Sequence, residues 1–283
     1  MSKICIVVGM PRAATTYLYQ TLASHPDAFV PARKELEFYS INYARGNAWY
    51  ESFFADCRSD QVGFDISPIY FFSDAAIERI AELETNQRVI LIARKPSEFA
   101  LSWYKNRLVG DPNCPPLEQF LEQHVYAKDG AELELRIGPG EIPRRIRQYV
   151  DALGDRLLLL NYEDISQHAL ETMSCVEKFA GLSAYFDQEN LSTELVNAST
   201  QQPNRVLAYL THQKWFADLV TRVLPKNLIL SARKRVQSTS KHKAVLPEGV
   251  EQEYAARIDA LYAADDQLVA DLLSAQLPAG RSE

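Results

Sequence analysis

The sequence predicts an α/β fold, a three-layer sandwich around a central parallel sheet. Three short apolar runs have the length and composition of buried strands, at residues 4–8, 89–93 and 157–160. Polar or turn residues follow each run, and a helical pattern comes next. Strands that alternate with helices favour right-handed crossovers between parallel strands, so ligands are expected at the carboxyl ends of the strands.

Helices are predicted from apolar residues that recur at helical spacing. The expected helices cover 15–23, 74–84, a segment starting near Pro96, and 142–153, and helical periodicity recurs at 207–224 and 250–273. Loops are expected at 110–116 and 138–140, with a charged helical segment between them. We expect one domain over residues 1–283, with a helical C-terminal part at 207–283 that includes a mobile loop at 233–243.

Composition indicates a globular protein and disfavours several partners. The 283 residues are 47% hydrophobic and 24% charged, with a formal net charge of -7. A protein that wraps a long polyanion needs the opposite charge balance, so no nucleic acid partner is expected and a heavily sulfated polysaccharide is disfavoured as a ligand.

The cysteines and the first apolar run predict a cytoplasmic location. The four cysteines are far apart in sequence and form no CxxC pair, so neither a zinc site nor a disulfide framework is indicated. The run at 4–8 is too short for a signal peptide or a membrane span, which predicts no membrane association.

Residues 9–16 join the first strand to the first helix, where a phosphate-binding loop belongs. The nucleoside-triphosphatase pattern GxxxxGK[ST] does not fit, because Ala14 replaces its second Gly and Thr15 replaces its Lys. Arg12 supplies a cation three residues earlier, before small residues and a pair of threonines. On this segment alone, an ordinary strand-to-helix turn capped by Thr is as good an interpretation.

The second predicted strand also ends in a cation. A phosphoryl-transfer enzyme would place an Asp there to hold magnesium, but this chain has Arg94. Eight residues later, Ser102 falls in the next predicted helix, where its hydroxyl could reach the same anion. Taken singly, these are an ordinary strand-end arginine and an ordinary helical serine, so the combination carries the argument.

The first loop resembles a motif of a known enzyme family. The run Pro11-Arg12-Ala13-Ala14-Thr15-Thr16 is similar to P[KR]xGTT, the 5'-phosphosulfate loop of sulfotransferases that use 3'-phosphoadenosine 5'-phosphosulfate (PAPS). The resemblance extends from Ile4 to about Leu182 and is closest in motif style to glycan (heparan-type) and bacterial soluble sulfotransferases. It implies a P-loop-like fold in which these six residues bind the donor and Arg12 contacts its bridging oxygen. Ala14 departs from the usual Gly.

The resemblance also implies residues for the rest of the nucleotide. Arg94 and Ser102 match the family's Arg and Ser that hold the 3'-phosphate. Tyr162, in Asn161-Tyr162-Glu163-Asp164, matches a Tyr that lies near the nucleotide. A tyrosine with a buried ring and a hydrogen-bonded hydroxyl is an equally open interpretation of Tyr162.

A catalytic base is implied near the first helix. Glu35 matches the base of a KExxFF segment in the glycan-type branch, and Arg33 or Lys34 beside it could also hold a phosphate of the donor. Glu37 is the neighbouring alternative as the base. A cluster of solvated charges with no catalytic role is the other interpretation of this segment. Asp65 begins a segment similar to the family's SPxY motif and is a reserve candidate for positioning the acceptor.

The resemblance therefore implies a sulfotransferase. It would move a sulfuryl group from PAPS to a hydroxyl or amine of a small-molecule or carbohydrate acceptor, with Glu35 as base, Arg12 stabilising charge, no metal ion, and 3',5'-adenosine diphosphate (PAP) as product. Two alternatives stay open. One is a P-loop nucleotide or small-molecule kinase, and the other is a catalytically idle nucleotide-binding protein.

Overall fold

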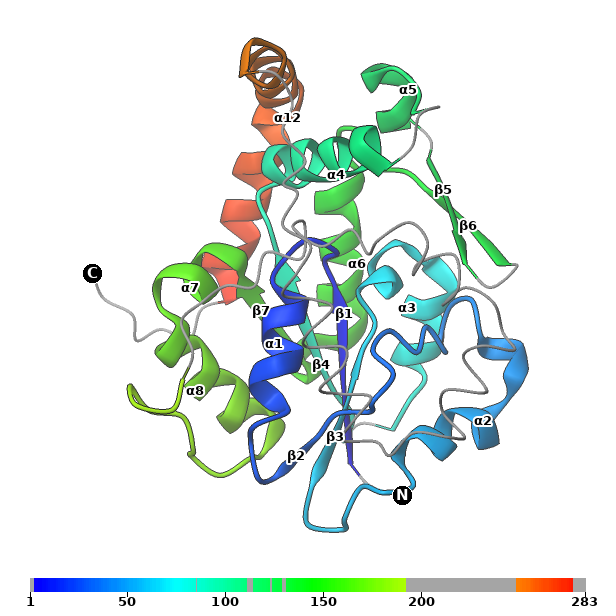
Figure 1. The fold of residues 1–283 in the computed structure, drawn as a ribbon, viewed down its shortest axis with the longest axis vertical. Coiled ribbons are helices and arrows are strands. Elements are labelled where there is room, and N and C mark those ends of the chain that lie inside the picture. Colours follow the sequence, from blue (N-terminus) through cyan, green and yellow to red (C-terminus); the bar gives the residue numbers. More distant parts are fainter. Residues whose placement is uncertain are drawn as a thin grey trace. The chain divides into compact units, whose positions relative to one another are not determined.

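The computed structural model describes residues 3–84, 86–110, 114–122, 124–128, 131–191 and 248–276 (Figure 1). Contacts divide the chain into two compact units, Met1–Val196 with Glu251–Glu283, and Asn197–Val250. Apart from the start of the last helix, all that follows concerns the first unit. The helix predicted at 207–224 and the loop predicted at 233–243 lie outside the described residues, so they and the single-domain organisation stay predictions.

The described elements follow one another in a strand–helix alternation. The strands are β1 Ile4–Gly9, β2 Ala28–Phe29, β3 Val62–Ile66, β4 Arg88–Ala93, β5 His124–Lys128, β6 Ala131–Leu135 and β7 Leu157–Asn161. The α-helices are α1 Thr15–Leu22, α2 Asn47–Glu51, α3 Asp74–Ala81, α4 Pro96–Gly110, α5 Leu117–Glu122, α6 Glu141–Leu153, α7 Tyr162–Gln167, α8 Ala169–Ala180 and α12 Glu248–Gln276. Short 3-10 helices lie at Tyr43–Arg45, Ser52–Phe54, Pro68–Phe72 and Gly154–Arg156.

The central sheet confirms the predicted fold class. Its five strands have the order β2-β3-β1-β4-β7, and every neighbouring pair is parallel. The three strands predicted from apolar runs are β1, β4 and β7. The strands β2 and β3 were not predicted, and β3 is fully buried although Gly63 and Asp65 interrupt its apolar character.

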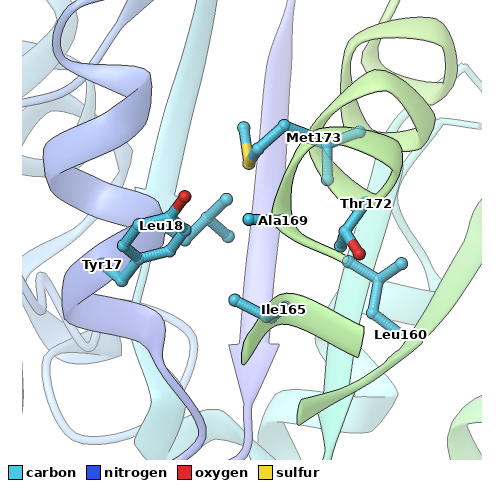
Figure 2. A pocket seen from close by; sticks show the side chains of 8 residues that line it. Tyr17, Leu18, Leu160, Ile165, Ala169, Thr172 and Met173 are labelled. Carbon is cyan, nitrogen blue, oxygen red and sulfur yellow. The ribbon is translucent and has the colours of Figure 1, made fainter. Parts of the chain in front are cut away.

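Helices cover the sheet on both faces (Figure 1). On one face, Tyr17 and Leu18 of α1 line a narrow apolar pocket together with Ile165, Ala169 and Met173 of α7 and α8 (Figure 2). On the other face, α3 packs against α6. The packing of α1 against α7 and α8 holds α1 on the sheet, and with it the loop that leads from β1 into α1.

One predicted segment is wrong. The charged helical segment expected between the loops at 110–116 and 138–140 is helical only over α5, and an antiparallel pair of strands, β5 and β6, follows. The sequence held a signal for this hairpin, since Asp129-Gly130 between two strand-length segments is a preferred hairpin turn sequence. The charged residues that suggested a helix are equally compatible with strands.

The C-terminal helix α12 confirms the helical periodicity predicted at 250–273. Ile258, Tyr262 and Val269 are buried along one side of it, and the Tyr262 hydroxyl donates to the carbonyl oxygen of Ile137. Within the described ranges, no helix has both the length and the apolar character needed to cross a bilayer. The cytoplasmic location stays a prediction.

Candidate active site

The carboxyl ends of the strands gather the residues that the sequence singled out. Arg12 follows β1, Arg94 follows β4, and Tyr162 follows β7, and these three strands are neighbours that run in the same direction. The strand β1 lies between β3 and β4, so the chain order reverses here. Open parallel sheets bind ligands at such a reversal, outside the carboxyl ends of the strands.

Arg12 and Arg94 lie in one place and not in separate clefts. The Arg94 guanidinium donates from Nη1 to the carbonyl oxygen of Arg12 at 3.0 Å. The Arg12 guanidinium donates from Nε to Oγ of Ser102 at 3.4 Å. The Arg94 guanidinium also lies 4.5 Å from the ring centroid of Tyr162, within cation–π range. Four residues predicted from separate segments therefore form one continuous set of contacts.

Glu98 is a member of this set that sequence reasoning missed. Its Oε2 accepts from Nε and Nη2 of Arg94, each at 3.3 Å, and so orients the guanidinium. The signal was present, because Glu98 stands four residues after Arg94 at the start of a predicted helix, and acid and base at that spacing face each other on a helix.

The electrostatics of this set favour an anionic ligand. The pKa of Arg12 is lowered, first by burial and then by the positive charge of Arg94. Among the residues that the structure describes, the Arg12 guanidinium contacts the Ser102 hydroxyl and no carboxylate. Two cations held together in this way repel each other, so an anion between them would stabilise the arrangement.

The loop at residues 11–16 offers backbone donors to such an anion. The first N–H groups of α1 have no acceptor inside the helix, and the N-cap residue Ala14 supplies no side-chain acceptor. Ala13 and Thr15 are buried, while Pro11, Arg12, Ala14 and Thr16 are partly exposed. Ala14 has φ 56°, in the left-handed region, which explains why Gly is usual here in the resembling motif.

Glu35 lies at the carboxyl end of β3, the strand next to β1. Its N–H donates to the carbonyl oxygen of Ile66 at 3.3 Å, which holds this segment against the carboxyl end of β3. Its carboxylate pairs with Nζ of Lys34 at 2.8 Å and is 35% exposed. Glu37, the alternative, is only 1% exposed. Of the two acids, Glu35 is the one that an incoming molecule can reach.

Asp65 is fully buried and makes its contacts with neighbouring hydroxyl groups. It is 0% exposed, and its carboxylate accepts from the hydroxyls of Ser67 at 2.6 Å and Tyr70 at 2.8 Å. The hydroxyl of Ser67 also accepts from the N–H of Glu37 at 3.0 Å. The pKa of Asp65 is raised to about 6, chiefly by burial and to a smaller extent by nearby Glu37, although the hydrogen bonds lower it. Asp65 therefore orients Ser67, which fixes the backbone at Glu37, and its role in positioning the acceptor stays a prediction.

Among the described residues, positive φ at non-glycine positions is confined to these two segments. Across the described ranges, the non-glycine residues with positive φ are Arg12, Ala14, Glu35 and Glu37, at φ 55° to 62°. Such residues cost free energy and cluster at functional sites, where the surrounding structure holds them. The two segments follow the carboxyl ends of neighbouring parallel strands, β1 and β3, so we treat them as one candidate site.

The fold and this pair of arginines define a P-loop-like α/β protein. Residues 5–91 match the model of a family described as the sulfotransferase family. Bifunctional heparan sulfate N-deacetylase/N-sulfotransferase 1 of Homo sapiens is 28% identical over 198 residues, which cover 64% of this chain and 22% of that protein. Heparan sulfate glucosamine 3-O-sulfotransferase 5 of Mus musculus is 28% identical over 207 residues, which cover 66% of this chain and 55% of that protein.

A solved structure supports the same fold. The sulfotransferase from Alicyclobacillus acidocaldarius matches with a TM-score of 0.53 at 19% identity, over 81% of this chain and 96% of that one. Over the matched residues, the chain is therefore similar to enzymes of the sulfotransferase family. It spans between about a fifth and about half of the length of the curated relatives named above.

Proposed function

We propose that this protein transfers a sulfuryl group from PAPS to a hydroxyl or amine of a small-molecule or carbohydrate acceptor. The contact that carries the proposal is the one between the two strand ends, in which Arg94 donates to the Arg12 carbonyl and Arg12 donates to Ser102. PAPS carries anionic groups at both its 5' and 3' positions. One pair of arginines held this closely can bind both groups of a single nucleotide.

Different residues would bind the two anionic ends of the donor. The loop Pro11-Arg12-Ala13-Ala14-Thr15-Thr16 would hold the 5'-phosphosulfate, with backbone N–H groups at the start of α1. Arg94 and Ser102 would hold the 3'-phosphate. The Tyr162 ring packs on the Arg94 guanidinium and so reinforces this arm of the site.

The transfer step is an in-line displacement. Glu35 accepts the proton of the acceptor hydroxyl, whose oxygen forms a bond to sulfur as the bond from sulfur to the 5'-phosphate oxygen breaks. The departing PAP gains the negative charge that leaves with that oxygen. Arg12 and the loop N–H groups face this growing charge, which is electrostatic stabilisation by groups already in place.

The acceptor class follows from charge and from the relatives. The net charge of -7 disfavours nucleic acid and long sulfated chains, so a small molecule or a short neutral sugar fits better. The curated relatives are named for heparan sulfate, which favours a carbohydrate. Metal-free transfer remains part of the proposal, and within the described ranges no three His, Cys, Asp or Glu side chains gather as a metal site.

Calorimetric titration tests the donor. PAP is titrated in a chelator, and ATP is titrated with and without magnesium. The variant Arg94→Met should weaken PAP binding roughly 10- to 100-fold, the usual loss for a charged hydrogen-bonding group. Arg88→Met is the matched control, because Arg88 is an exposed arginine at the other end of the same strand, β4.

The outcomes separate the proposal from its rivals. Tight PAP binding in chelator that depends on Arg94 and not on Arg88 supports it. An ATP preference that needs magnesium would indicate a kinase instead. PAP binding without sulfation of any hydroxyl or amine in a panel of sugars and small metabolites would indicate an idle nucleotide-binding protein.

A further inference from the structure

Two consecutive aspartates of α12 reach the starts of two different helices. The carboxylate of Asp266 accepts from the N–H of Ser97 at 3.0 Å and from its hydroxyl at 2.8 Å, at the start of α4. The carboxylate of Asp265 accepts from the N–H of Gly140 at 2.7 Å, at the start of α6. Figure 1 shows α12, in orange to red, running past the start of α4.

The start of α4 lacks a cap of its own. Its first backbone hydrogen bond runs from the Phe99 N–H to the Lys95 carbonyl at 2.9 Å, which makes Lys95 the N-cap residue. A lysine side chain offers no acceptor, and Pro96 has no N–H. The N–H of Ser97 is therefore the first donor that needs a partner, and Asp266 serves it as an N-cap Asp would, from 169 residues away.

The helix α4 carries much of the proposed donor site. Arg94 immediately precedes its N-cap, Glu98 in its first turn orients the Arg94 guanidinium, and Ser102 accepts from Arg12. A small displacement or fraying of the first turn of α4 would move all three side chains together. Asp266 lies on a helix that buried Ile258 and Val269 hold in place.

We propose that Asp266 is a positioning residue of the donor site, through which α12 fixes the start of α4 and so the geometry of Arg94 and Ser102. The proposal rests on the proposed function, since it concerns the same nucleotide site. Asp266 touches no donor atom itself and acts through α4.

The chain offers a matched control for this role. Asp265 stands next to Asp266 on the same helix and also accepts from a backbone N–H at a helix start, that of Gly140, the N-cap residue of α6. The helix α6 carries none of the proposed donor residues. Replacement of either aspartate by Ala should lower the melting temperature by a similar amount, roughly 2–4 °C. Only Asp266→Ala should weaken PAP binding, by about tenfold, whereas Asp265→Ala should stay within about twofold of the wild type.

Charge alone predicts the opposite result. Asp266 is a negative group that also lies 3.5 Å from Nζ of Lys95, so its removal leaves the surroundings more positive and should favour an anion. A weaker PAP affinity in Asp266→Ala therefore reports a change in geometry. Asp266→Asn removes the same charge but keeps an acceptor for the Ser97 N–H, so it should bind PAP as tightly as the wild type or more tightly.

Hydrogen exchange of the full-length protein without ligand gives a readout that does not depend on PAP. Amides in the first turns of α4 should exchange about tenfold faster in Asp266→Ala than in Asp265→Ala or Asp266→Asn. Equal exchange in all variants, or equal loss of PAP affinity in the two Ala variants, would overturn the positioning role. A wild-type protein that binds no PAP would overturn the proposed function instead, while the exchange rates would still decide whether Asp266 holds α4.

Discussion

At the ends of β1 and β4 the candidate site presents two guanidinium groups, whereas at the end of β3 it presents carboxylic acids. We call the first the donor side and the second the acceptor side. On the donor side, Arg12 and Arg94 are held by contacts between site residues, namely with Ser102, Glu98 and the Arg12 carbonyl. These contacts set side-chain positions directly.

The acceptor side is held through the backbone instead. The N–H of Glu35 donates to the end of β3, and the N–H of Glu37 donates to Ser67, which Asp65 orients in turn. Only the Glu35 carboxylate reaches a partly exposed position. A base has to meet one proton at one place, so a fixed backbone with one accessible acid suits that task.

The difference teaches that binding of the donor and activation of the acceptor depend on separate sets of contacts. Mutations on one side should therefore leave the task of the other side almost intact. A variant of the proposed base tests this separation directly, and variants of a buried acid and of a strained backbone position test how each side is held.

The substitution Glu35→Gln should abolish transfer without loss of the donor. The amide keeps the shape of the side chain but cannot take a proton, and loss of a general base costs roughly 10²- to 10⁴-fold in rate. PAP affinity should stay within about twofold, because the donor side is intact. Sulfate transfer from PAPS to a panel of sugars and small hydroxyl compounds measures the first effect, and PAP titration measures the second.

Two comparisons sharpen this result. Glu78→Gln changes an exposed acid on α3 and should leave both measurements unchanged. If Glu35→Gln retained normal turnover, Glu35 would not be the base. If it lost PAP binding in proportion to turnover, the donor side and the acceptor side would not be separable.

The donor side could be predicted from sequence for a definite physical reason. Arg12 and Arg94 each follow a continuous apolar strand, and parallel strands place such ends on one edge, so two local patterns were enough to bring the residues together. Ser102 follows from helical spacing after Arg94. The resemblance to a family added their assignment to one nucleotide.

The rest of the site depends on contacts that local patterns do not contain. The strand β3 carries Gly63 and Asp65 where a buried strand usually has apolar residues, so it was not recognised, and neither was its role beneath Glu35. The capping of α4 by Asp266 joins residues 169 positions apart and has no signature in either segment. Such contacts become visible only in the folded chain.

The buried acids of the acceptor side should give the protein a particular dependence on pH. Burial raises the pKa of Asp65 to about 6, above that of an unfolded chain, so the folded state keeps this proton longer and its stability falls as pH rises through about 4 to 6. The pKa difference between the folded and the unfolded chain corresponds to a loss of roughly 3 kcal/mol in the free energy of unfolding. Asp65→Asn mimics the protonated acid at every pH, so its own free energy of unfolding should not fall in this way. The amount by which the variant is less stable than the wild type should therefore shrink by up to about 3 kcal/mol between pH 4 and pH 7.

Urea unfolding at the two pH values measures the effect. Asp151→Asn removes an exposed carboxylate and corrects for the general effect of a lost negative charge. A deficit of Asp65→Asn that is equal at both pH values would show that Asp65 is ionised without cost in the folded protein. Burial of the Asp65 carboxylate would then cost the folded protein less free energy than its enclosed position indicates.

The smallest expected effect concerns backbone strain, which both sides contain. Ala14 on the donor side has φ 56° and ψ 17°, a conformation that costs an L-residue roughly 1 kcal/mol and costs glycine almost nothing. Ala14→Gly should therefore raise the free energy of unfolding by about 0.5–1 kcal/mol after the entropy of the unfolded chain is counted. PAP affinity should change by less than about twofold, since the loop keeps its shape.

The neighbouring residue Ala13 provides the contrast, because it is fully buried and is not among the residues with positive φ. Ala13→Gly loses a buried methyl group and adds freedom to the unfolded chain, so it should lower the free energy of unfolding by roughly 1 kcal/mol. Thermal unfolding of the two variants should thus move in opposite directions. A shift in the same direction would mean that the loop after β1 does not hold Ala14 in a left-handed conformation, and the strain shared by the two sides would reduce to Arg12, Glu35 and Glu37.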